Sequence, residues 1–130
     1  MDQQTYDTKR AEIFAEYNSN MSKSDARLDE LREMNRDIED CCDRINNFQQ
    51  HFKYTLEHHK SELAQHDSTE DFAIFNELEE EIHADCRIAE TALLDEKEEN
   101  EREHKKIFRE QEDYGYEYKS AIIALDENAH

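Results

Sequence analysis

The sequence predicts an all-α protein, a long antiparallel helical hairpin of the coiled-coil type. The chain of 130 residues has one glycine and no proline, so the residues that supply tight turns and strand edges are scarce. Charged residues make up 39% of the chain, and Glu, Lys and Arg among them favour helices. Apolar residues recur at alternating steps of three and four, which is the spacing of a helix with one buried side.

The composition also limits the size and the role of the protein. With 35% hydrophobic residues and no Trp, residues 1–130 can form one small domain with a thin core. The sequence contains no glycine-rich phosphate loop and no strand–turn–helix pattern for a nucleophile, so we expect no enzymatic activity and no cofactor. A formal net charge of -19 would repel nucleic acid and anionic membranes.

The cysteines and the N-terminal segment indicate a compartment. Cys41, Cys42 and Cys86 are an odd number, and a bridge between the two neighbours would be strained in a helix, so we expect reduced thiols. No run approaches the ~20 apolar residues of a membrane span, and residues 1–10 lack the apolar stretch of a signal peptide. We therefore expect a cytoplasmic protein without membrane insertion. Export with a partner, without a cleaved signal peptide, is the alternative.

The first helix is predicted from about residue 5 to residue 65. Its apolar stripe follows a heptad-like spacing. The stripe consists of Leu28, Leu31, Met34, Ile38, Cys41, Ile45, Phe48 and Phe52. Ser22 to Asp25, SKSD, matches a capping box, which marks a helix start. A break at residues 20–24 with a short separate N-terminal helix, and one continuous helix, both stay open.

The turn is predicted within residues 65–71, QHDSTED, because Ser68 and Asp71 form a second capping box. A second helix then runs from about residue 69 to residue 127. Equal rise per residue in both arms gives an antiparallel register in which the numbers of facing residues sum to roughly 135. The predicted hairpin core comprises Ile45, Phe48, Phe52, Phe72, Phe75, Ile82, Leu93, Tyr114 and Tyr118.

The same register predicts a partner-binding surface. Leu31, Met34 and Ile38 face Asp95–Lys106, DEKEENEREHKK, which contains no apolar residue. An apolar stripe without an apolar counterpart is expected to be exposed and to bind a helix of a partner. The alternative is that the long stems of Glu, Lys and Arg cover the stripe. The predicted partner-binding residues are Leu28, Leu31, Met34, Ile38, Cys41 and, pointing away from the seam, Tyr116.

A metal site is not predicted. Glu80–His83 and Glu101–His104 match the Glu-x-x-His pattern of di-iron helical bundles. Both pairs lie on one predicted helix, and a separation of 21 residues corresponds to about 30 Å along its axis. One chain therefore cannot bring them to a common ion.

The layout of nearly the whole chain resembles the small helical proteins encoded beside LXG toxins of the Gram-positive type VII secretion system. It is most similar to the second, more acidic of the two LXG-associated α-helical partners. The segment Phe75–Tyr118 looks like that family's charged helix, which ends in an acidic, Tyr-bearing stretch. QHDSTED stands where the sister secreted proteins carry a Trp-x-Gly turn. The resemblance implies a non-enzymatic targeting factor or chaperone that binds the helical N-terminal LXG domain of a cognate toxin, together with a second small helical protein.

Two other functions stay open. A self-associating structural coiled coil would pair the same stripe with a second copy. An acidic mimic of DNA that blocks a nucleic-acid-binding protein would follow from the charge alone.

Overall fold

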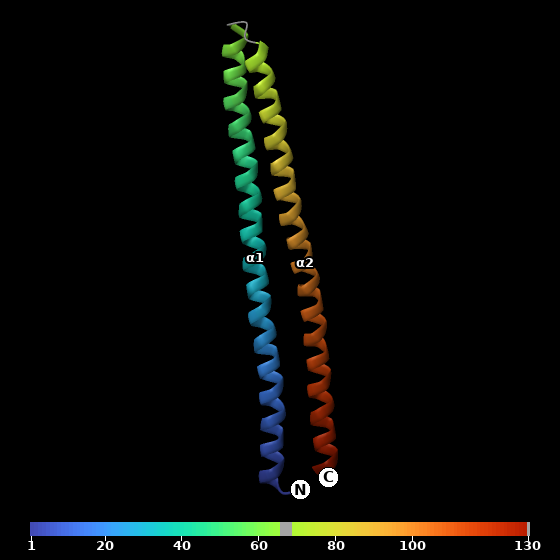
Figure 1. Cartoon of the computed structure of the whole chain (residues 1–130). Coiled ribbons are helices and arrows are strands. Elements are labelled where there is room, and N and C mark those ends of the chain that lie inside the picture. Colours follow the sequence, from blue (N-terminus) through green and yellow to red (C-terminus); the bar gives the residue numbers. More distant parts are fainter. Residues whose placement is uncertain (66–68, 130) are drawn as a thin grey trace. The chain divides into compact units, whose positions relative to one another are not determined.

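The computed structural model describes residues 1–65 and 69–129. These residues form two α-helices, α1 (Gln3–Gln65) and α2 (Thr69–Ala129), and no strand among them (Figure 1). The two helices pack against each other as an antiparallel hairpin, so the predicted all-α hairpin is confirmed. Residues 66–68, in the predicted turn, lie outside the described residues.

The chain divides into two compact units. Unit 1 comprises Met1–Glu33 and Glu99–His130, and unit 2 comprises Met34–Glu98. Each unit contains one segment of α1 and one segment of α2, and each is described below by itself.

The N-terminus of α1 is capped by Asp2. Its carboxylate oxygen Oδ1 accepts a hydrogen bond of 2.7 Å from the backbone N–H of Thr5, as an N-cap residue does. This backbone hydrogen bond lowers the pKa of Asp2. The cap explains why α1 begins at Gln3, two residues before the predicted start.

No break interrupts α1 at residues 20–24, so the continuous helix is the correct alternative. The hydroxyl of Ser24 donates a hydrogen bond of 2.9 Å to the carbonyl of Asn20, one turn earlier, and the side chain is buried. A serine that bonds back into the preceding turn satisfies itself inside a helix instead of starting a new one.

In unit 1, aromatic stacking and polar pairs join the helices. The rings of Tyr17 and Tyr118, whose numbers give the predicted sum of 135, stack with centroids 4.7 Å apart. Closer to the termini, the hydroxyl of Tyr6 donates a hydrogen bond to Asp126, which raises the pKa of Tyr6. The buried apolar side chains of this unit are Leu28, Leu31, Ile107 and Leu125.

In unit 2, Ile38 and Leu56 are the buried apolar side chains. Ion pairs between described residues of the two helices include Lys60 with Glu79 at 2.7 Å and Lys97 with Glu39 at 3.2 Å. Six predicted core residues of this unit are half-buried: Ile45, Phe52, Phe72, Phe75, Ile82 and Leu93. In unit 1, Tyr114 and Tyr118 are also half-buried.

Phe48 is the exception, because its side chain is 50% exposed. The half-buried positions of α1 after Ile38 include Cys42, Ile45 and Gln49, whereas Cys41 is exposed. One residue corresponds to about 100° around a helix. Cys41 and Phe48 each precede a half-buried residue by one position, so their side chains point away from α2. Phe48 instead stacks on Phe52 of its own helix, with centroids 6.0 Å apart.

Candidate partner-binding surfaces

The predicted docking stripe is largely closed. Leu31 is 0% exposed, Ile38 is 5% exposed, and Leu28 is also buried. Met34 is half-buried. The expectation that Leu31 and Ile38 are left uncovered is therefore wrong, and the role of the stripe in binding a partner stays a prediction.

The polar segment Asp95–Lys106 itself covers the stripe. Within unit 1, Asn100 is 6% exposed, and Glu103 and His104 are half-buried. Within unit 2, Lys97 is half-buried and pairs with Glu39 on α1. Long polar side chains can place their carbon stems over apolar groups while the charged ends pair at the edge, so a helix segment without apolar residues can still close a seam.

The ion pair between Arg27 and Glu103 belongs to this cover in unit 1. The guanidinium donates two hydrogen bonds to the carboxylate, one of 2.9 Å from Nε and one of 3.0 Å from Nη2. A third hydrogen bond, of 2.9 Å, reaches Glu30 on the same helix. The hydrogen bonds to Glu103 and Glu30 raise the pKa of Arg27, and the same contact lowers the pKa of Glu103. These two hydrogen bonds link the helices at this level.

Cys41 and Tyr116 are the two predicted binding residues that lie on the surface. Cys41 is exposed, and Tyr116 is 69% exposed. Their role in binding a partner stays a prediction.

Large apolar side chains are exposed along another face of α2 in unit 2. Ile74, Leu78, Ile88 and Ala92 follow steps of three and four when Glu81 and Asp85 are included, so the six residues form one row along the helix. We call these six residues the outer row. Ile88 is 70% exposed, and Ile74 and Leu78 are also exposed. The row lies about a third of a turn around α2 from the side that faces α1.

The surface beside Ile88 is hollowed. Small side chains, Ala84, Thr91 and Ala92, surround the isoleucine, and Arg87 and Asp95 border the depression. Small residues beside one large apolar side chain let another helix approach closely.

The outer row escaped the sequence prediction because the stronger stripe of Phe72, Phe75 and Ile82 dominates the pattern. A second repeat of threes and fours that starts at Ile74 was the signal that could have found it. Its two acidic members weaken the apolar pattern.

Neither a metal site nor a membrane span is found among residues 1–65 and 69–129. No three His, Cys, Asp or Glu side chains in this part of the chain lie close enough to hold an ion. Neither α1 nor α2 contains, within that part, a stretch apolar enough to cross a bilayer.

Comparison of the chain with protein-family models, curated proteins and solved structures gave no match.

Proposed function

We propose that this chain is a non-catalytic helical binding protein that docks a helix of another protein against the outer row of α2. The observation that carries the proposal is the exposure of Ile74, Leu78 and Ile88 at helical spacing. Apolar residues with this period on a second face of a helix are the anchors of helix-in-groove recognition. An α-helix that packs on two sides can join a hairpin to a third helix.

The charge of the chain favours a partner over a second copy. Glu81 and Asp85 lie inside the outer row, and the whole chain carries a formal net charge of -19. Two copies would bring like charges together across the row, whereas a helix with Lys or Arg opposite these carboxylates would pair with them. We therefore propose that the docked helix, which belongs to another protein, has basic residues on either side of its apolar residues.

We propose further that the partner is the helical N-terminal LXG domain of a type VII secreted toxin. In this proposal the chain is a targeting factor or chaperone for that domain, beside a second small helical protein. The resemblance of Phe75–Tyr118 to the acidic LXG-associated proteins supports this choice, and the segment includes most of the outer row. An acidic surface would also keep the chain dispersed before assembly.

The test is the mass of the particle in solution, measured by light scattering during size exclusion. The chain is measured alone and with the purified LXG domain of its proposed cognate toxin. We expect a defined complex with the LXG domain. A homodimer that ignores the LXG domain would contradict the proposal and favour the self-associating coiled coil.

A matched pair of variants assigns the surface. The double variant Ile74→Glu, Ile88→Glu should lose the complex, because a helix interface would have to desolvate two unpaired charges. Its control is the double variant Asn47→Glu, Tyr54→Glu, which also adds two negative charges, at exposed positions of α1 outside the outer row. The control should retain the complex. Equal loss in both variants would show that added charge, not the outer row, controls binding.

A further inference from the structure

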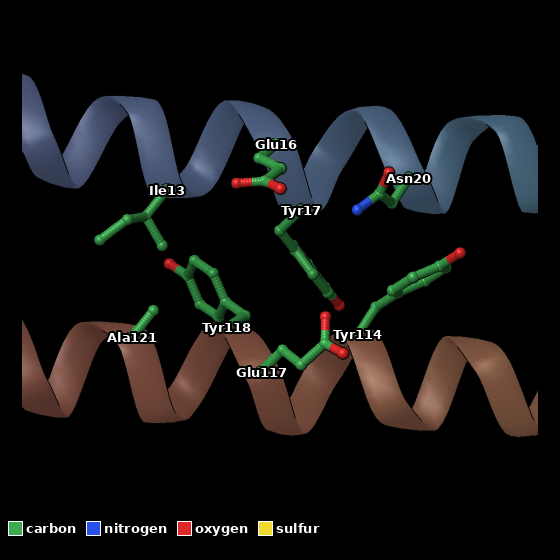
Figure 2. A pocket seen from close by; sticks show the side chains of 8 residues that line it. All are labelled: Ile13, Glu16, Tyr17, Asn20, Tyr114, Glu117, Tyr118 and Ala121. Carbon is green, nitrogen blue, oxygen red and sulfur yellow. The ribbon is translucent and has the colours of Figure 1, made fainter.

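Unit 1 contains a cavity of about 150 Å³ between its segments of α1 and α2 (Figure 2). Among its eight lining residues are three tyrosines, Tyr17, Tyr114 and Tyr118, and two carboxylates, Glu16 and Glu117. Figure 2 shows the three tyrosine side chains in the space between the helices, with Glu16 on α1 and Glu117 on α2 beside them.

The aromatic walls are held in place by contacts within the unit. Tyr17 and Tyr118 stack at 4.7 Å with an angle of 30° between their planes. Phe14 packs edge-on against the ring of Tyr118, with ring centroids 6.3 Å apart and an angle of 68° between the ring planes. Tyr118 is thus supported by two rings, and Tyr114, one turn earlier on α2, adds a third tyrosine to the cavity wall.

The chemistry of the lining selects a class of ligand. Two carboxylates and three electron-rich rings line the cavity, and none of its eight residues is basic. An anion would be repelled by the two carboxylates, whereas a cation would be attracted by them. Aromatic faces attract cations, and tyrosine cages hold alkylated ammonium groups, which are only weakly hydrated. A cavity of ~150 Å³ accommodates a group about the size of benzene.

We propose that this tyrosine cavity binds an alkylated ammonium group. The group can belong to a free small molecule or to a methylated lysine side chain, and both would offer the same chemistry to the rings and carboxylates. The proposal does not depend on the outer row or on the LXG domain.

Isothermal titration of the full chain with choline tests the chemistry. The matched ligand is 3,3-dimethyl-1-butanol, which has the shape of choline but no charge. We expect saturable binding of choline and none of the neutral analogue, in a background of constant NaCl. Equal heats for both ligands, or no saturable binding of choline, would overturn the proposal.

Variants locate the site. Glu117→Gln changes an exposed side chain that lines the cavity, so it should leave the fold unchanged and weaken choline binding roughly fivefold. Tyr118→Leu should weaken binding at least as much, with Tyr116→Leu as the control, because Tyr116 is exposed and does not line the cavity. Should Tyr118→Leu unfold the unit, Glu117→Gln alone decides. Unchanged affinity in Glu117→Gln would overturn the assignment.

The source of the group follows from a second titration, with a neutral peptide that carries one trimethyllysine. Tighter binding of the peptide than of choline supports the cavity as a site for a methylated protein, and equal or weaker binding supports it as a site for a small molecule.

Discussion

Ile38 and Ile88 are the same residue type in the same unit, yet one is 5% exposed and the other is 70% exposed. Both belong to repeats of threes and fours, and both have acidic residues near them in sequence. The repeat therefore shows that a helix has an apolar face, but not which face packs against the other helix of the hairpin. Leu31 and Ile38, which the sequence predicted to be exposed, are buried core residues. The apolar residues of the outer row, which the sequence analysis did not identify, are exposed to solvent.

The largest expected effect comes from placing the same charge at both positions. Ile38→Glu buries a carboxylate without a partner and should destabilise the chain by about 3 to 5 kcal/mol. Ile88→Glu should change stability by less than about 0.5 kcal/mol, because the side chain is in water. Urea unfolding followed by circular dichroism measures both. Comparable losses in the two variants would erase the distinction.

A smaller contrast separates two leucines. Leu31 is 0% exposed, so Leu31→Ala should cost about 2 to 5 kcal/mol through lost burial and the remaining cavity. Leu94 is exposed, and Leu94→Ala should cost less than about 0.5 kcal/mol. If Leu31→Ala melted like the wild-type chain, the cover formed by the polar segment would be open in solution.

Asn100 is a buried polar residue between the two helices of unit 1, which are otherwise joined there by the buried apolar residues. Among the described residues, no buried side-chain nitrogen or oxygen is left without a hydrogen-bond partner. A buried Asn fixes register and oligomeric state in coiled coils at a cost in stability. Asn100→Leu should therefore raise stability by about 1 kcal/mol and broaden the mass distribution measured by light scattering. Lower stability with a single mass would contradict this role.

The smallest expected change is in how the stability of the chain depends on pH. The hydrogen bond from Lys60 lowers the pKa of Glu79 below its ordinary 4.5, so the folded state binds this proton less readily than the unfolded chain. The stabilisation is present above the ordinary pKa and is lost as the pH falls through the lower folded value. Glu79→Gln should cost less than about 1 kcal/mol at neutral pH and reduce the loss of stability on acidification. Identical pH dependence in the wild-type chain and in Glu79→Gln would show that the ion pair between Lys60 and Glu79 does not contribute to stability.

The sequence predicted the hairpin, both helices and the register because spacing and turn composition are local properties that a single chain records. It assigned Cys41 and Phe48 to the apolar stripe, although their neighbours Cys42 and Gln49 are the half-buried ones, because the polar Gln49 carries no apolar signal and adjacent cysteines look alike. Side-chain burial decides between them.

The closure of the stripe escaped prediction for a different reason. Asn100 carries no apolar signal, and the cover over Leu31 depends on where the polar ends of long side chains are held across the seam. Such pairs depend on three-dimensional distances. The same limit hid the tyrosine cavity, since the sequence indicated Tyr114 and Tyr118 only as core residues.

Hydroxyl-radical footprinting of the chain, free and mixed with the LXG domain that we propose as its partner, distinguishes the two surfaces, because it reports the solvent exposure of individual side chains. We predict that Ile74 and Ile88 are oxidised in the free chain and protected in the complex, while Leu31 and Ile38 react in neither state. Oxidation of Leu31 and Ile38 in the free chain, with protection of these two residues in the complex, would contradict the account and restore the stripe as the docking surface.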